Sequence, residues 1–355
     1  MSPATRPPRT RDALRLLLVE AASGAIHDGE FAELIEALRP GDLLVVNDAA
    51  TLPASLPGTV GQAQDAAPVE LRLLGLAEPE RLEPDADDRW RVVLFGRGDW
   101  REDTNRRPPP PELELGAVIE LAGGLRAELV ARSPSSPRLL ELRFDRSGVE
   151  LHAALYAAGR PVQYSHLEEP LELWSVQTVF ASRPWAVEMP SAGRPLSAGM
   201  LAALRRRGVE LARLTHAAGL SATGDPQLDA LLPLPERYEI PTETVTALAR
   251  TRACSGRVIA VGTTVVRALE GAARADGIVR AGPGVTDLII TPSRALRVVD
   301  ALLTGMHDPS ESHYRLLGAF TPPALLERAW DRALASGYRS HEFGDLALLW
   351  SARAA

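Results

Sequence analysis

The sequence lacks lysine entirely and contains one cysteine and two asparagines among its 355 residues. All 39 basic residues are therefore arginine. Without a lysine amine the chain cannot form a lysine Schiff base, and it cannot supply the P-loop lysine that grips the β- and γ-phosphates of a nucleotide. The abundance of Arg, Ala, Gly and Pro is the composition that GC-rich coding produces.

The single cysteine, Cys254, excludes an intrachain disulfide and any multi-cysteine zinc or iron–sulfur site. It stands near the expected end of a helix, and we interpret it as structural. No run approaches the roughly 20 apolar residues of a membrane span, and the first residues show no apolar core of a signal peptide. We therefore expect a cytoplasmic protein with no membrane partner.

Hydrophobic residues make up 45% of the chain and charged residues 24%, which is ordinary for a globular protein. The length allows one large domain or two of moderate size. Acidic residues outnumber basic ones by 46 to 39, so the formal net charge is −7. The sequence does not fix the oligomeric state, and we take a monomer as the simpler expectation.

Two kinds of hydrophobic pattern alternate along the chain. Residues 1–57 and 148–355 combine apolar strands with amphipathic helices, which indicates an α/β layer with a mostly parallel sheet. The expected strands include Asp42–Asn47, Val258–Val261 and Asp287–Thr291, and the expected helices include Val149–Ala158 and Thr264–Arg274. Residues 58–147 show short alternating runs between Gly, Pro and acidic clusters. We predict an α/β domain, 1–57 and 148–355, interrupted by an inserted small all-β barrel domain, 58–147.

The segment Val258–Glu270 is the most informative local pattern. An apolar strand runs into Gly262-Thr263-Thr264 and then a helix, so hydroxyls and backbone N–H groups lie at a helix N-terminus beyond the strand's carboxyl end. Open α/β sheets bind ligands there. Arg267, one turn into the helix, is suited to a carboxylate or phosphate. Alternatively, a threonine caps the helix and Arg267 is a surface residue paired with Glu270.

Three other segments can contribute polar groups. Asn47 and Asp48 end an apolar strand and can orient a ribose or an amine, or form an Asx turn. Ser191 and the N–H groups around Gly193 can contact a carboxylate, or form a plain loop. The loop 303–313 holds two His, an Asp and a Glu without metal-ligand spacing, so we expect no metal site there. His307 suits acid/base chemistry.

Seven segments, in order along nearly the whole chain, carry a family resemblance. They are GDLLVVND (41–48), VQTVFA (176–181), PSAG (190–193), ERYEIP (236–241), GRVIAVGTTVVRALE (256–270), VDALLTGMH (299–307) and YRSHEFGD (338–345). Together they resemble the QueA family of S-adenosylmethionine:tRNA ribosyltransferase-isomerases. The family's α/β domain with an inserted β-barrel is similar to the fold that the periodicity predicts.

The resemblance implies an enzyme that uses S-adenosylmethionine as a co-substrate, without a metal. Its ribosyl unit would pass to the aminomethyl group of a 7-deazaguanine in tRNA and rearrange to an epoxycyclopentane, releasing adenine and methionine. The resemblance implies acid/base or amine-orienting roles for Asp48, Glu236, His307 and Asp345. It implies donor binding by Asn47, Ser191, Gly193, Gly262, Thr263, Thr264 and Arg267.

The chain departs from the family pattern around these positions. Ala49-Ala50 replace Thr-Arg, Arg194-Pro195-Leu196 replace Leu-His-Phe, Leu231 and Leu234 replace two histidines, Gly305-Met306 and Asp308 replace Asn-Phe and Leu, and His341-Glu342-Phe343 replace Phe-Ser-Tyr. These changes predict a divergent branch. Three interpretations stay open: the tRNA acceptor, the same donor chemistry on a small molecule, and an inactive paralogue that binds an adenosyl ligand or a protein partner.

The charge of −7 and the absence of a basic stripe count against tRNA, because nucleic-acid binding draws on arginine contacts to phosphate. Arg205–Arg207 at a helix end would face solvent or contact phosphate. Folding that gathers this run beside the Gly-Thr-Thr turn would favour tRNA.

Overall fold

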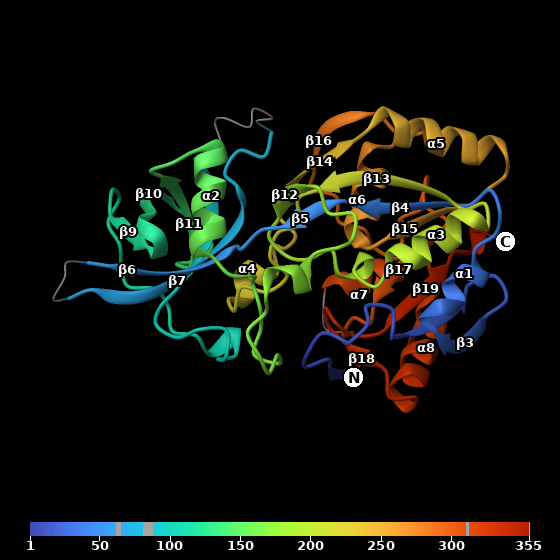
Figure 1. Cartoon of the computed structure of the whole chain (residues 1–355), viewed down its shortest axis with the longest axis horizontal. Coiled ribbons are helices and arrows are strands. Elements are labelled where there is room, and N and C mark those ends of the chain that lie inside the picture. The colour runs from blue at the N-terminus through green and yellow to red at the C-terminus, as the bar shows by residue number, and fades with distance from the viewer. Residues whose placement is uncertain (62–64, 81–87, 310–311, 355) are drawn as a thin grey trace.

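A nine-stranded mixed sheet and a six-stranded closed barrel lie side by side (Figure 1). The computed structural model describes residues 1–61, 65–80, 88–309 and 312–354. The sheet runs β16-β14-β13-β4-β15-β17-β19-β2-β3. Its strands are β2 (Arg15–Glu20), β3 (Ala25–Glu30), β4 (Leu43–Asn47), β13 (Glu210–His216), β14 (Glu236–Ile240), β15 (Val258–Val261), β16 (Gly282–Thr286), β17 (Ala301–Gly305) and β19 (Leu346–Trp350).

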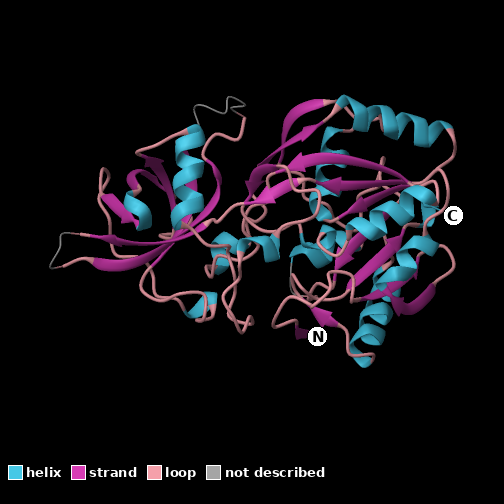
Figure 2. Cartoon of the chain, viewed as in Figure 1, coloured by secondary structure: helices cyan, strands magenta, loops and turns pink. Residues whose placement is uncertain are grey.

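Helices cover both faces of this sheet (Figure 2). Alternate residues of β4 explain how: Leu43 and Val45 pack with α5, α6 and α8, while Leu44 and Val46 pack with α1 and α3. The strand is buried on both faces, and its residues 43–46 are all apolar. The helices of this part are α1 (Leu34–Ala37), α3 (Ala198–Arg206), α4 (Pro226–Asp229), α5 (Thr242–Ala253), α6 (Thr263–Ala272), α7 (Ser312–Leu317) and α8 (Pro323–Ala335).

The barrel closes in the order β10-β11-β8-β7-β6-β9. Its strands are β6 (Ser55–Val60), β7 (Ala67–Leu76), β8 (Arg89–Phe95), β9 (Val118–Leu121), β10 (Arg126–Arg132) and β11 (Leu139–Phe144). Helix α2 (Gly148–Ala158) follows and buries Leu151 and Leu155 in the same core. Two short pairs complete the fold: β1 (Ser2–Pro3) with β18 (Arg339–Ser340), and β5 (Ala49–Thr51) with β12 (Arg183–Ala186).

The predicted fold class, an α/β domain with an inserted all-β barrel, is confirmed. The domain limits at residues 58 and 147 stay a prediction. The expected strand Asp287–Thr291 is wrong, because the strand of this region ends at Thr286 and pairs antiparallel with β14. The sheet is also mixed rather than mostly parallel, since four of its eight strand pairs are antiparallel.

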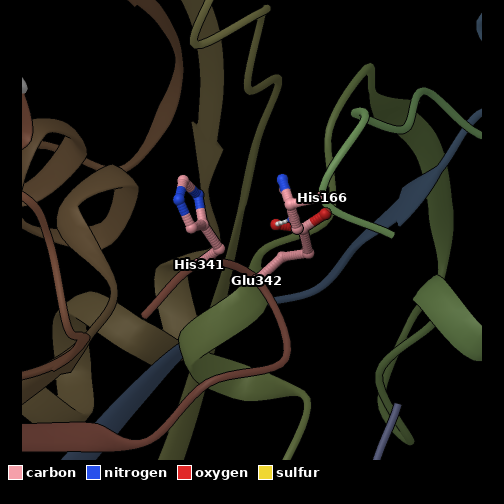
Figure 3. Close-up of side chains that lie close together, drawn as sticks. All are labelled: His166, His341 and Glu342. Atoms are coloured by element: carbon pink, nitrogen blue, oxygen red, sulfur yellow. Dashed lines mark hydrogen bonds and ion pairs between the residues drawn. The ribbon is translucent and has the colours of Figure 1, made fainter. Parts of the chain in front are cut away.

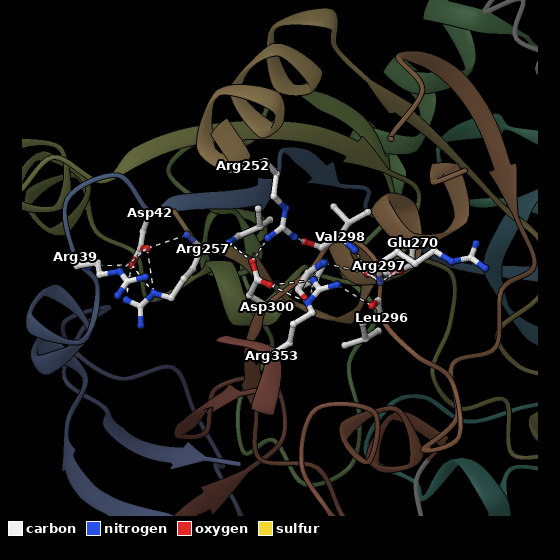
Figure 4. Close-up of polar contacts among 12 residues, drawn as sticks. Arg39, Asp42, Arg252, Arg257, Glu270, Leu296, Arg297, Val298, Asp300 and Arg353 are labelled. Carbon is white, nitrogen blue, oxygen red and sulfur yellow. Dashed lines mark hydrogen bonds and ion pairs between the residues drawn. The ribbon is translucent and has the colours of Figure 1, made fainter. Parts of the chain in front are cut away.

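Arginine–carboxylate contacts hold the amino edge of the central strands (Figure 4). Asp42, at the start of β4, accepts from the Arg257 side chain, and Asp300, before β17, pairs with Arg252 and Arg353. Glu270 of α6 accepts the backbone N–H groups of residues 297–299. With this edge occupied by ion pairs, the opposite carboxyl edge carries the candidate site. Within the described residues, no helix combines the length and apolar character needed to cross a membrane.

Candidate active site at the carboxyl edge of the sheet

The parallel strands β13, β4 and β15 end together, and Asn47 ties their ends to one another. Its Nδ2 donates to the His216 carbonyl oxygen at 3.0 Å and to Thr264 Oγ1 at 3.3 Å. Its Oδ1 accepts the N–H groups of Ala49 at 3.1 Å and His216 at 2.9 Å. The contact with Ala49, two residues on, is the Asx-type turn of the alternative interpretation. Asn47 is therefore a buried positioning residue that holds Thr264 at this edge.

His216, Glu236 and Arg267 form a buried polar triad beside this junction. Arg267 Nη1 donates to Glu236 Oε2, and the other Glu236 oxygen accepts the N–H of Gly219 at 2.7 Å. His216 Nε2 lies 3.5 Å from Glu236 Oε2, and neither ring nitrogen has a hydrogen-bond partner among the described residues. Burial, reinforced by the charge of Arg267, holds the pKa of His216 well below its ordinary value. The imidazole is therefore neutral at pH 7.

The alternative interpretation of Arg267 as a surface residue paired with Glu270 is wrong. Arg267 is 6% exposed, and its Nε also donates to the Leu288 carbonyl oxygen at 3.0 Å. Glu270 faces the opposite end of the sheet, where it accepts three backbone N–H groups. Although they are only three residues apart, the two charged residues of α6 contact opposite edges of the sheet.

The turn after β15 places the first turn of α6 at the same edge. Gly262 is the N-cap residue and adopts φ 89°, ψ 155°, a conformation that favours glycine. Thr263 and Thr264 lie inside the helix, so the alternative in which one of them is the N-cap is wrong. The N–H groups of a first helical turn lack intrahelical partners and favour anionic groups.

The segment Ser191–Gly193 forms a short 3-10 turn beside this helix start. Ala192 packs in the core with Val261, and its Cβ lies 3.7 Å from the position that a Cβ on Gly262 would take. A Cβ on Gly193 would approach the Phe180 ring to 2.9 Å, so this close packing needs glycine. Both predicted donor-binding segments therefore meet at one place.

Asp48 lies next to the junction, and its two carboxylate oxygens accept hydrogen bonds from neighbouring hydroxyls. Its Oδ1 accepts from Thr215 at 2.6 Å and its Oδ2 from Ser182 at 2.9 Å. Arg213, which is largely exposed, lies 3.8 Å from Oδ2. Asp48 thus joins β4 to β13 and to the segment before β12.

His307 and Asp345 lie together at the end of β17. His307 Nε2 is 2.9 Å from Thr304 Oγ1, and its carbonyl oxygen accepts from the Trp330 indole at 2.7 Å. The Met306 N–H donates to the Asp345 carbonyl oxygen. The Asp345 carboxylate accepts the N–H groups of Arg15 and Arg339, each at 2.8 Å, so it shapes the turn. Glu311, the glutamate of the 303–313 loop, lies outside the described residues.

A small cleft opens between the barrel and this edge of the sheet. Its walls come from β7 and β8 of the barrel, from β12, and from the segments before β14 and after β13. Glu236 is the predicted site residue that lines it. Trp185 lies on the α/β side, with the Arg237 guanidinium 4.1 Å from its ring centroid. Arg91 of the barrel donates to the Pro235 carbonyl oxygen at 3.2 Å and so bridges the two parts.

The sequence prediction missed His216, Trp185 and Arg91. His216 ends the half-polar strand β13, whose register beside β4 pairs Leu214 with Asn47 and so places His216 at the carboxyl edge, where its N–H donates to Asn47 Oδ1. An expected strand there would have indicated it. Trp185 and Arg91 approach the cleft from segments 94 residues apart, and no local pattern reveals such a meeting.

Arg205–Arg207 do not join the site. They form the carboxyl end of α3 and precede the amino end of β13, whereas the Gly-Thr-Thr turn follows the carboxyl end of β15. Strands β13, β4 and β15 run parallel, so the arginine run lies at the opposite edge. The Arg207 side chain donates to the carbonyl oxygens of Leu38 and Glu36.

These features define an α/β protein with an inserted β-barrel and a polar site between the two, at the carboxyl ends of parallel strands. The chain belongs to the family of queuosine biosynthesis proteins, whose model matches residues 2–349. The family resemblance expected from the sequence is thereby confirmed.

Similar proteins match this chain over nearly its whole length. The chain is 36% identical over 353 residues to the S-adenosylmethionine:tRNA ribosyltransferase-isomerase of Anaeromyxobacter dehalogenans, covering 98% of this chain and 95% of the relative. It is 34% identical over 357 residues to that of Rhodospirillum rubrum, covering 98% and 94%. The crystal structure of the S-adenosylmethionine tRNA ribosyltransferase from Thermotoga maritima is 26% identical, with a TM-score of 0.51 and coverage of 98% and 95%.

Proposed function

We propose that this chain is an S-adenosylmethionine:tRNA ribosyltransferase-isomerase of queuosine biosynthesis. It transfers the ribosyl unit of S-adenosylmethionine to the aminomethyl group of a 7-deazaguanine in tRNA and rearranges it to an epoxycyclopentane, releasing adenine and methionine. The single observation that carries this function is the family match over residues 2–349, which spans both the sheet and the barrel. The relatives named above share this one activity in their names.

The donor side of the site is the junction of β4, β15 and α6. The first turn of α6, with Gly262, Thr263 and Thr264, offers N–H groups and hydroxyls for the methionine carboxylate or a ribose. Ser191 and Gly193 close this place from the other side. Asn47 positions Thr264, and Arg267 acts through Glu236 because its guanidinium is already engaged.

The acceptor side is the cleft. An extruded base stacks on aromatic rings and guanidinium planes in RNA-binding sites, and Trp185 with Arg237 supplies both. Glu236 lines the same cleft as a carboxylate that Gly219 and Arg267 hold in place. It is placed to orient the cationic aminomethyl group and to accept its proton, which makes the amine a nucleophile.

The remaining acid/base steps belong to the donor side. The sulfonium acidifies the adjacent C–H, and a base must remove that proton, while adenine needs a proton to leave. Asp48 and His307 stay our candidates for these steps. Asp345 supports the turn beside His307 through its two backbone N–H contacts.

A tRNA substrate implies an enzyme of the cytoplasm, and we retain a monomer as the working state. The test is incubation with S-adenosylmethionine and tRNA that carries the aminomethyl deazaguanine, with adenine followed by chromatography. Adenine release should match the modified tRNA one to one. Release that is equal with tRNA lacking this base would contradict the acceptor, and the absence of any calorimetric heat with S-adenosylmethionine would contradict the enzyme.

A further inference from the structure

Two histidines and a glutamate that the proposed reaction does not use converge beside the turn that carries Asp345. His341 and Glu342 lie in the turn between β18 and β19, and His166 comes from the segment that follows α2 (Figure 3). One donor atom from each side chain lies within 4.8 Å of the other two. His166 and Glu342 are half-buried, and His341 is exposed.

One pair of donor atoms has the spacing of neighbouring ligands in a metal coordination sphere. His166 Nε2 and Glu342 Oε2 are 3.1 Å apart. Bonds of about 2.0–2.1 Å at tetrahedral angles place neighbouring ligand atoms about 3.4 Å apart. The two imidazole rings stack with centroids 4.4 Å apart. The exposed His341 supplies the third donor atom, within 4.8 Å of the other two.

The surrounding charge favours a cation. Glu188 is half-buried close by, where its carboxylate accepts from the Tyr164 hydroxyl and the Ser221 N–H. Glu188 lies close enough to Glu342 for the charges of the two carboxylates to interact. Among the described residues, no arginine forms an ion pair with either glutamate, and Arg194 nearby stacks on Phe343 and donates to the Ser175 carbonyl oxygen. A divalent cation would balance the negative charge of both carboxylates.

We propose that His166, His341 and Glu342 bind one divalent transition-metal ion, with water completing the coordination. Two imidazoles and one carboxylate suit Zn²⁺ and its neighbours rather than Mg²⁺ or Ca²⁺. The ion joins the segment after α2 to the turn that carries Asp345, which in turn contacts Met306 beside His307. It is a structural site, and no metal enters the proposed reaction.

The sequence alone does not reveal this site, because its ligands lie 175 residues apart and match no metal-ligand motif. His341 and Glu342 stand where the family pattern has Phe and Ser, so the ligand pair is a feature of this chain rather than of the pattern. His341 also adopts φ 67°, a left-handed conformation that is uncommon for residues other than glycine and asparagine.

The experiment uses the untagged full chain after chelator treatment, titrated with Co²⁺ and Zn²⁺. We expect one Co²⁺ per chain with visible d–d absorption, displaced by Zn²⁺, and a higher melting temperature. His341→Asn tolerates the backbone conformation, and Glu342→Ser restores the residue of the family pattern. Loss of an outer partner already weakens metal binding about 10–100-fold, so each variant should lose at least that much.

His27→Asn is the matched control, because His27 and Glu33 form an exposed pair at 2.8 Å with only two donors. It should bind Co²⁺ like the parent chain. Three results would overturn the proposal: no binding at one equivalent, binding that His341→Asn and Glu342→Ser leave unchanged, or binding that His313→Asn removes instead. Circular dichroism of each variant separates lost binding from lost folding.

Discussion

Arg267 shows what an all-arginine chain gains at a single residue. Its guanidinium donates hydrogen bonds simultaneously to Glu236 and to the carbonyl oxygens of Leu288 and Thr286. An ammonium on a flexible stem lacks this planar fork and loses more conformational freedom for each contact. The same logic holds at the amino edge, where Arg353 reaches Asp300 and two carbonyl oxygens. Arginine alone therefore supplies the buried cationic contacts of the site, and no lysine is needed for them.

Arg267→Lys should separate Glu236 from its partner. We expect the free energy of unfolding to fall by about 2–3 kcal/mol, as for lost hydrogen bonds to charged groups, and kcat/KM for tRNA modification to fall at least about tenfold. Denaturant titration and adenine release measure the two effects. Arg274→Lys, at an exposed position after the same helix, is the control and should change neither. Wild-type activity in Arg267→Lys would refute the positioning role.

His216 should make stability depend on pH. Its pKa is lowered in the folded chain, so the unfolded chain binds the proton more readily. Stability from this residue is therefore complete above its unfolded pKa of about 6.5 and falls below it, by up to about 1.4 kcal/mol per pH unit. Urea unfolding of the parent and of His216→Asn at pH 7 and pH 5.5 should show the smaller loss in the variant. Equal losses would show that His216 does not titrate on unfolding.

Single residues were predictable where a local pattern carried them. The Gly-Thr-Thr turn and Asn47 follow apolar strands, and the structure places both at the carboxyl edge. Glu236 came from the resemblance alone, and the structure shows it lining the cleft. The pairing of Arg267 with Glu236 was not predictable, because the nearer Glu270 is the natural partner in sequence and only the sheet brings Glu236 to it.

At the scale of elements, apolar runs were reliable and half-polar strands were not. Val258–Val261 was predicted residue for residue, since both faces of the strand are buried. Strand β14, with the sequence Glu-Arg-Tyr-Glu-Ile, lies near the sheet edge and keeps polar side chains. Its period of two extends over only five residues, and β16 is rich in glycine. Tertiary pairing, rather than local propensity, decides such strands.

Gly262→Ala should damage the start of α6. The residue has φ 89° and ψ 155°, a region that costs an alanine about 1–3 kcal/mol. We expect a loss of stability in that range, and weaker calorimetric binding of S-adenosylmethionine as the first turn shifts. Gly199→Ala makes the same substitution at an exposed position in α3, with 3.8 Å to the nearest atom, and should stabilise by about 0.5–1 kcal/mol. Unchanged donor binding in Gly262→Ala would remove this turn from the donor site.

At the scale of the whole molecule, net charge was a poor guide to the partner. The excess of seven acidic residues argued against tRNA, yet the chain belongs to a family whose relatives are named for tRNA modification. Net charge sums over the entire surface, whereas binding depends on what lines one cleft. At the amino edge, arginines form ion pairs with carboxylates. These charges enter the net charge of the chain but do not face the cleft.

The barrel and the sheet form the cleft jointly, so its geometry depends on how they are held together. Arg91 of β8 donates from Nε to the Leu76 carbonyl oxygen within the barrel and from Nη2 to Pro235 across the cleft, each at 3.2 Å. Pro235 precedes Glu236, the residue that we propose to orient the acceptor amine. Burial lowers the pKa of Arg91, but the guanidinium stays charged at neutral pH.

Arg91→Ala should therefore weaken tRNA modification while leaving the donor site intact. Loss of the bridge frees Pro235 and misplaces Glu236, and small misplacements of reacting groups cost up to about 100-fold in rate. We expect kcat/KM for tRNA to fall by about 10–100-fold, with S-adenosylmethionine affinity unchanged by calorimetry. Arg97→Ala, at an exposed position just after β8, should behave like the parent chain. Equal losses of donor and acceptor binding would mean that Arg91 supports the whole fold, whereas loss confined to tRNA assigns the barrel to the acceptor.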